Sequence, residues 1–130
     1  MRAYEGLSPA PDSILMLQLV ANQQNTNIHG DIYAGWLLDQ MDSAATILAT
    51  QMSQGRCTTV AVDRIEFLSP VNVGDVVSIY ARLQESGRSS MVIAVEVFAR
   101  NPSGDLGAKV TEGNFTAVAI SADGNIRQLV

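Results

Sequence analysis

The segment AGWLLDQMDSAATILA, residues 34–49, decides the fold of this 130-residue chain. Its apolar side chains recur every three or four residues, which predicts an amphipathic α-helix over about residues 32–52. Gly55 follows, and a glycine here is typical of a helix stop because glycine readily adopts the left-handed conformation. The side chains predicted to face the rest of the protein are Leu37, Leu38, Met41, Ala44, Ala45, Leu48 and Met52.

On both sides of this helix the sequence favours β-strands. A short aliphatic run covers residues 13–21, and apolar residues alternate with polar ones over 58–68, 75–85, 90–100 and 108–120. Within 58–68 the alternation changes phase between Val62 and Ile65, which predicts a β-bulge. The turn segments NVGD, ESGR and NPSGD leave no room for further helices, so the last four strands are expected to pair antiparallel.

The order of these elements predicts an α+β protein. A single long apolar helix and one largely antiparallel sheet bury each other only when the sheet curls around the helix. We therefore expect a curved antiparallel sheet of about five strands around one long central helix. The composition, 47% hydrophobic and 16% charged, is that of a globular protein with one core. We expect a single domain over residues 13–130, preceded by a flexible N-terminal arm over residues 1–12.

Composition and charge also limit the partners. No apolar run approaches the roughly 18 residues that span a bilayer, and the first residues lack the apolar middle of a secretory signal. We therefore expect a cytoplasmic protein with no membrane partner. The net charge of -5 opposes binding of nucleic acid. One cysteine, Cys57, and one histidine, His29, are too few for an internal disulfide or a four-ligand zinc site, so no metal is expected.

Two carboxylates interrupt the apolar helix. Asp39 falls on its polar side and is predicted to be solvated. Asp42 borders the apolar face among small residues, and two interpretations stay open. It is either a residue at the margin of the helix that reaches water, or a carboxylate that faces a cleft and is suited to act as a general base. Periodicity alone does not choose between them.

Three segments carry a resemblance to a known family: NTNIHGDIYAGWLLDQMDSAATILA (25–49), GRCTTVAVDRIEFLSPVNVGDVVSIYARL (55–83) and GRSSMVIAVEVFAR (87–100). From about residue 15 to 118 the chain resembles the bacterial hotdog-fold acyl-CoA thioesterases of the YciA type. The helix start, the QMD at 40–42 and the FLSPVNVGD at 67–75 occur in the family's order and spacing. The resemblance implies the hotdog fold and hydrolysis of acyl-CoA to a free acid and CoA. It implies no cofactor, because CoA is part of the substrate.

The resemblance also implies roles for individual residues. Asp42 matches the catalytic carboxylate, acting either as general base for water or as a nucleophile that forms an anhydride. Asn27 matches an asparagine that helps to hold the thioester carbonyl. The backbone N–H of Ala34 or Gly35 matches the oxyanion contact, at the positive end of the helix dipole. Thr59 lies where related enzymes place a hydroxyl near the attacking water.

A second group of residues is expected to bind CoA. Arg88, Ser89 and Ser90 look like the segment that touches the CoA nucleotide in the family. The phosphates of CoA need positively charged side chains. Because the net charge of the chain is negative, these side chains must lie at the binding site itself. Arg56, next to Gly55, is a second candidate. For each arginine, simple exposure to solvent is the alternative.

Two positions depart from the family pattern. His29 stands where close relatives often carry asparagine, and we expect it to be a turn residue and not a base. Ala34 replaces the first of two glycines. Because a backbone N–H survives this change, the oxyanion contact is retained, although the methyl group narrows the space beside it.

The spacing of the implied catalytic residues predicts an oligomer. Ala34 and Asp42 are eight residues apart, which is roughly 12 Å along a helix. One thioester carbonyl cannot contact both, because reacting atoms lie within about 3 to 3.5 Å of their partners. If both act on the same thioester, Asp42 meets the helix start of another subunit. We expect a homodimer with two composite sites, and the family's assemblies include trimers of dimers.

Two alternatives remain on the same fold. A non-catalytic acyl-CoA binding module would use Asp42 structurally. A hydratase or dehydratase would pair a histidine with a carboxylate on the catalytic turn or helix, whereas His29 has no clear partner in the sequence.

Overall fold

The helix and strands that the sequence predicts are present in a computed structural model, which describes residues 8–104 and 107–129. The strands are β1 (Ile14–Val20), β2 (Cys57–Phe67), β3 (Val76–Ser86), β4 (Ser90–Arg100) and β5 (Ala108–Ala119). Between β1 and β2 lie a short 3-10 helix, η1 (Gln23–Asn25), and the long helix α1 (Ala34–Ser53). The predicted bounds of α1 and of the strands agree with these to within two residues.

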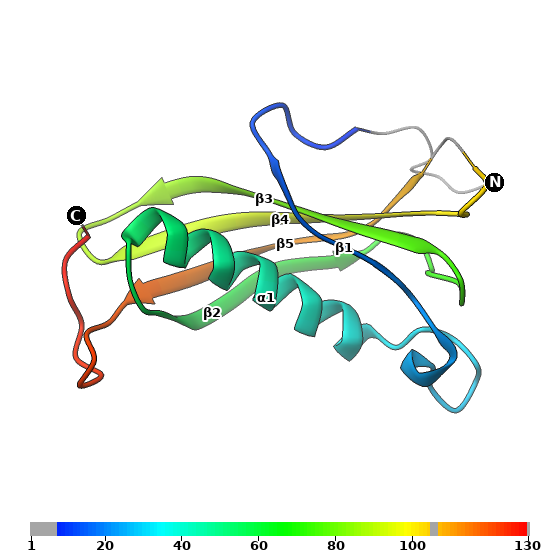
Figure 1. Cartoon of the computed structure of the whole chain (residues 1–130), viewed down its shortest axis with the longest axis horizontal. Helices are drawn as coiled ribbons and strands as arrows, with labels where there is room; N and C mark the ends of the chain where they lie inside the picture. Colours follow the sequence, from blue (N-terminus) through cyan, green and yellow to red (C-terminus); the bar gives the residue numbers. More distant parts are fainter. Residues whose placement is uncertain (1–7, 105–106, 130) are drawn as a thin grey trace.

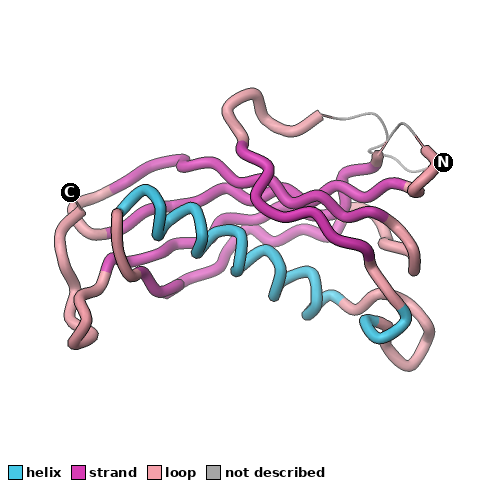
Figure 2. Tube along the Cα trace, viewed as in Figure 1, coloured by secondary structure: helices cyan, strands magenta, loops and turns pink. Residues whose placement is uncertain are grey.

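The strands form one antiparallel sheet of order β1-β3-β4-β5-β2. The antiparallel pairing expected for the last four strands is confirmed. β2 pairs with β5 and not with β3, its neighbour in sequence, so β1 and β2 are the edges of the sheet. α1 lies across one side of the sheet, which we call the helix side, and the opposite side is the outer side (Figures 1 and 2).

The core lies between α1 and the helix side of the sheet. The predicted inner face of α1 is buried at Leu37, Met41, Ala44, Ala45 and Leu48. Facing it are the alternating side chains of the central strands: Val77, Ile79, Ala81, Met91, Ile93, Val95, Val97 and Ala99. Met52 was expected to be buried but is 43% exposed. The last turn of α1 packs instead through Ser53, which is 1% exposed and contacts the C-terminal residues.

The end of α1 differs from the prediction. The left-handed residue is Gln54, with φ 57°, and its N–H donates to the carbonyl of Thr50. Gly55 does not have a positive φ, so its conformation is not the reason for a glycine at this position. A Cβ atom on Gly55 would instead lie 2.6 Å from Nη2 of Arg127. A side chain at position 55 would therefore require that guanidinium to shift.

The edge strand β2 is irregular and partly apolar on its surface. Its pairing with β5 shifts between Asp63 and Glu66, where Arg64 has φ 56°, so the predicted bulge is confirmed. A second shift lies between Thr59 and Ala61. Val62, opposite the buried Phe115, is on the helix side of the sheet yet 46% exposed. This chain's own helix therefore leaves part of the helix side uncovered next to β2.

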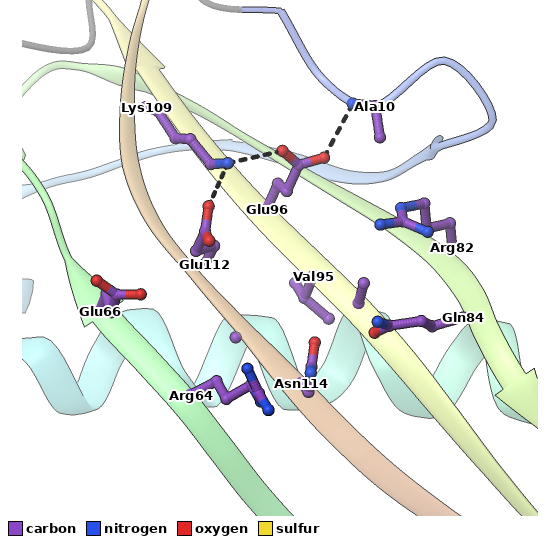
Figure 3. Close-up of a pocket in the computed structure, with 12 residues that line it drawn as sticks. Ala10, Arg64, Glu66, Arg82, Gln84, Val95, Glu96, Lys109, Glu112 and Asn114 are labelled. Carbon is purple, nitrogen blue, oxygen red and sulfur yellow. Dashed lines mark hydrogen bonds and ion pairs between the residues drawn. The ribbon is translucent and has the colours of Figure 1, made fainter.

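The outer side carries a polar cluster, viewed in Figure 3 with α1 behind the strands. Lys109 Nζ lies 2.9 Å from Glu96 Oε2 and also pairs with Glu112. The N–H of Ala10 donates to Glu96 Oε1 at 3.0 Å, so the segment before β1 lies against this side. Residues 1–7 of the predicted N-terminal arm lie outside the described residues.

Candidate active site

Asp42 and Thr59 meet where α1 faces the edge strand. The Oγ1 hydroxyl of Thr59 donates to Oδ1 of Asp42 at 2.6 Å. Both residues are half-buried, and Thr59 lies on β2 directly before the first irregularity of that strand. The contact joins the central helix to the edge of the sheet through one short, charge-assisted hydrogen bond.

This contact bears on the two interpretations of Asp42. Its carboxylate is neither freely solvated nor part of an ion pair with any described residue, whereas Asp39 is exposed, as predicted. The Thr59 hydroxyl fixes one carboxylate oxygen, and no described residue donates to the other. A carboxylate held in this way can accept a proton from a water molecule or attack an electrophilic carbon.

The start of α1 lacks a side-chain cap. Tyr33 at the N-cap position makes no capping hydrogen bond, and the first turn has no acidic residue. In the described part of the chain, neither the Ala34 nor the Gly35 N–H has a backbone acceptor, as expected for the first residues of a helix. Both residues are exposed. A 20-residue helix with an open, uncapped start offers N–H donors and positive potential to an anion.

A cavity of about 430 Å³ adjoins this helix start. It is lined by Ile32, Ala34, Phe67, Leu68, Ser69 and Pro70. The end of β2 and the loop that follows it therefore lie beside the first residue of α1. Most of its lining residues are apolar, and one of them is Ala34, whose N–H has no backbone acceptor among the described residues.

Asn27 lies in the loop that leads into α1. Its Oδ1 accepts the N–H groups of His29 at 2.8 Å and Asp31 at 3.2 Å. No described residue accepts from the amide NH₂ group of Asn27, so this group remains as a donor. Asn27 is exposed, in a loop tied to the helix start by the hydrogen bond from the Tyr33 N–H to the Asn25 carbonyl. His29 is an exposed turn residue, as predicted.

Within one chain these groups are not brought together. Thr59 contacts Asp42, but Ala34 is eight residues before Asp42, or about 12 Å along the helix axis. Asn27 is in the loop before the helix start, seven residues before Ala34. A single chain therefore holds two separate parts of a site: a carboxylate with its threonine, and a helix start with its asparagine.

Comparison with known proteins identifies the family. Residues 29–104 match the model of the thioesterase superfamily. The chain belongs to this superfamily. It is 41% identical over 122 residues to the acyl-CoA thioester hydrolase YciA of Escherichia coli strain K12, covering 92% of each chain.

Solved structures of other thioesterases share the fold. The hexameric thioesterase y2039 from Yersinia pestis has a TM-score of 0.88 and 44% identity, covering 93% of this chain and 98% of that one. Cj0915, a hexameric hotdog fold thioesterase of Campylobacter jejuni, has a TM-score of 0.83 and 34% identity, covering 89% and 90%. The hotdog fold and the YciA-type relationship implied by the sequence are thereby confirmed.

The expected CoA-binding residues of this thioesterase-superfamily member lie at the other end of α1. Arg56 precedes β2, while Arg88 and Ser89 form the turn between β3 and β4 and Ser90 begins β4. Both arginines are exposed. The N–H of Ile120 donates to the Arg56 carbonyl and that of Leu129 to the Arg88 carbonyl, each at 2.9 Å. The C-terminal residues thus bind both segments, a relationship that the sequence did not predict.

The remaining chemistry of the described residues is limited. Over residues 8–104 and 107–129, no group of three or more His, Cys, Asp or Glu side chains could hold a metal ion. No helix in that part of the chain is long and apolar enough to cross a membrane. Cys57 lies half-buried against the core, with its Sγ 3.0 Å from Oγ of Ser53.

Proposed function

We propose that this chain hydrolyses acyl-CoA thioesters to a carboxylic acid and CoA, with Asp42 as the reacting carboxylate. The observation that carries the proposal is the 2.6 Å hydrogen bond from Thr59 to Asp42, because it holds one carboxylate oxygen and leaves the other for a water molecule or a thioester. The 41% identity with a named acyl-CoA thioester hydrolase supports the choice of substrate.

The reaction adds water to the thioester carbon and breaks the carbon–sulfur bond. As a general base, Asp42 takes a proton from the attacking water, and that proton passes to the departing CoA thiolate; such help is worth about a hundredfold to ten-thousandfold in rate. As a nucleophile, it forms an anhydride that water then hydrolyses. The geometry accommodates both routes. In each, the carbonyl oxygen becomes negative and needs N–H donors, each worth about a hundredfold to a thousandfold.

We assign those donors to the helix start of a second copy of the chain. The far edge of β2 has no partner among the described strands, and Val60 and Val62 on it are exposed. Thr59 and Phe67 lie equally far from Asp63 along β2. If two copies pair antiparallel about Asp63, Thr59 of one chain approaches the partner's Phe67.

This pairing also delivers the helix start. Phe67 and Ala34 line the same cavity, so the partner's Ala34 arrives with the partner's Phe67 at Asp42. Asn27 of the partner would supply its NH₂ group to the same carbonyl. Each dimer would then hold two composite sites. The hexameric state of the Yersinia pestis and Campylobacter jejuni thioesterases supports a trimer of such dimers as the larger assembly.

The decisive test is thiol release from a panel of acyl-CoA chain lengths, with the wild type and Asp42→Ala compared. Turnover by the wild type and its loss in Asp42→Ala, with CoA binding retained, is the expected result. Binding of acyl-CoA without thiol release by the wild type would make the protein a binding module instead. Cytoplasmic location and independence of any cofactor remain predictions from the sequence.

A further inference from the structure

The C-terminal segment, residues 120–129, binds the end of the molecule that carries the expected CoA contacts. Its first residue, Ile120, donates to the Arg56 carbonyl, and Leu129 near its end donates to the Arg88 carbonyl. Figure 1 shows this segment, in red, beside the last turn of α1 and the turn between β3 and β4. Two loops that are distant in sequence are therefore tied to one another through this segment.

Arg127 makes the most extensive contacts of the segment. Its Nε donates to the Ile120 carbonyl at 3.0 Å, and its Nη1 to the Ser53 carbonyl at 3.2 Å. Its Nη2 donates to Ser53 Oγ at 3.1 Å and to the Arg56 carbonyl at 3.2 Å. Ser53 is the last residue of α1, where carbonyls lack helical partners and a positive charge is favoured. One guanidinium thus joins the end of α1, the residue before β2 and the C-terminal segment.

Gly55 lies against the same guanidinium. A Cβ atom at this position would lie 2.6 Å from Nη2 and 3.0 Å from Cζ of Arg127. The glycine is not required by its backbone conformation, because the left-handed residue is Gln54. A side chain at this position would therefore shift the guanidinium from its hydrogen-bonded place.

We propose that Arg127 is a positioning residue for CoA binding. Arg127 fixes the backbone at Arg56 directly, by donating to the Arg56 carbonyl. It fixes the backbone at Arg88 indirectly, because it holds the C-terminal segment from which Leu129 donates to the Arg88 carbonyl. Both exposed arginines then start from a fixed backbone, so less conformational freedom is lost when they bind phosphates. The inference rests on the proposed function, in which Arg56 and Arg88 contact the CoA nucleotide. Arg127 contacts neither Asp42 nor Thr59, so bond cleavage itself does not depend on it.

The test compares two substrates with the same thioester: butyryl-CoA, and butyryl-pantetheine, which lacks the nucleotide phosphates. For Arg127→Ala we expect KM for butyryl-CoA to rise about tenfold with kcat within about twofold, and both constants for butyryl-pantetheine to stay near wild type. Gly55→Ala, which keeps the arginine but displaces its guanidinium, should give the same pattern. Arg127→Lys keeps the positive charge but lacks the planar guanidinium, so its KM for butyryl-CoA should lie between those of the wild type and Arg127→Ala.

Arg100→Ala is the matched control. Arg100 also donates to carbonyls, those of Asn101 and Pro102, but in the loop that precedes β5. The Arg100→Ala variant should have the wild-type KM for both butyryl-CoA and butyryl-pantetheine. Equal losses of kcat with both substrates in Arg127→Ala and Gly55→Ala, in step with a lower Tm, would overturn the inference in favour of a purely structural role.

Failure of the inference is distinguishable from failure of the proposed function. If the wild type releases no thiol from either substrate, the proposed function fails. If the wild type is active and Arg88→Ala raises KM for butyryl-CoA while Arg127→Ala and Gly55→Ala do not, only the positioning role is overturned.

Discussion

Thr59 on β2 donates a 2.6 Å hydrogen bond to Asp42 on α1, so the proposed reacting carboxylate is oriented from the edge strand and not from its own helix. The strand that would pair with a second copy is therefore also the strand that holds Asp42 in place. In the proposed dimer, this one contact would couple assembly to catalysis.

Replacing the carboxylate tests its chemical role. Asp42→Asn keeps an oxygen that can accept the Thr59 hydrogen bond but removes the basic and nucleophilic group. We expect kcat to fall by about a hundredfold to ten-thousandfold with little change in Tm, as measured by thiol release. Asp39→Asn, an exposed carboxylate on the same helix, is the control and should keep full activity. Wild-type turnover in Asp42→Asn would move the chemistry elsewhere.

Removing the threonine hydroxyl tests the orientation of Asp42. Thr59→Val has a similar shape but no donor, so one oxygen of a half-buried carboxylate loses its partner, at a cost of about 1–3 kcal/mol. We expect a loss of roughly tenfold or more in kcat and a lower Tm. Thr59→Ser keeps a hydroxyl donor, so its kcat and Tm should lie close to those of the wild type. If the valine and serine variants behave alike, the hydroxyl has no role.

Mixing two inactive variants tests the composite site. Asp42→Ala removes the carboxylate, and Ala34→Pro removes one N–H at a helix position that tolerates proline. Tyr33 is already extended, with φ -81° and ψ 149°, as a residue before proline must be. In a heterodimer of the two variants, one site has both intact groups. Random mixing after unfolding and refolding should therefore restore up to about a quarter of wild-type activity.

The same experiment contradicts the dimer model if it fails. A site built within one chain would be damaged in every molecule of the mixture, and no activity would return. Each variant refolded alone is the control for partial recovery. A heterodimer tagged on one chain can be purified to measure its activity directly.

The outer side of the sheet predicts sensitivity to acid. Burial raises the pKa of Glu96, but hydrogen bonds from Ala10 and Lys109, together with the positive charges of Lys109 and Arg82, outweigh it and hold this pKa below its ordinary 4.5. Since the pKa is lower in the folded state, the stabilisation is fully present above pH 4.5 and is lost as the pH falls through the folded-state value. Tm measured against pH should fall less steeply below 4.5 in Glu96→Gln than in the wild type.

Glu66→Gln is the control for this experiment. Glu66 lines a pocket on the outer side together with Glu96 and Lys109, but it is exposed and forms no ion pair with a described residue. Its pH profile should follow the wild type. If both glutamine variants flatten the profile equally, net charge and not the contact with Lys109 and Ala10 governs the acid response.

The fold could be predicted largely from periodicity. The central strands have one buried face, so alternation identified their inward residues, and the phase change after Val62 marked the bulge. Periodicity failed at Met52, because the last turn of the helix packs through Ser53 against the C-terminal residues. The expectation of a left-handed glycine at the helix stop was wrong at Gly55, because Gln54 has that conformation and Gly55 lies instead against the Arg127 guanidinium.

The site could be predicted only in part. The pattern of α1 placed Asp42 at the margin of the apolar face, but its contact with Thr59 depends on how β2 docks beside the helix, which no local pattern encodes. Arg127 was missed because it is 74 residues from Ser53, its partner at the end of α1. The only sequence signal for it was a single arginine in a short polar tail.

At the uncapped start of α1, a substitution that increases thermal stability is expected to decrease the proposed thioesterase activity. A serine or aspartate in place of Tyr33 would cap the helix and add about 0.5–2 kcal/mol to the free energy of unfolding. The same side chain would accept a hydrogen bond from the N–H of Gly35, one of the donors proposed for the thioester oxygen, and an aspartate would repel the negative charge that develops on that oxygen. Selection for heat resistance alone would therefore favour variants with a capped helix, which are more stable but hydrolyse the thioester more slowly.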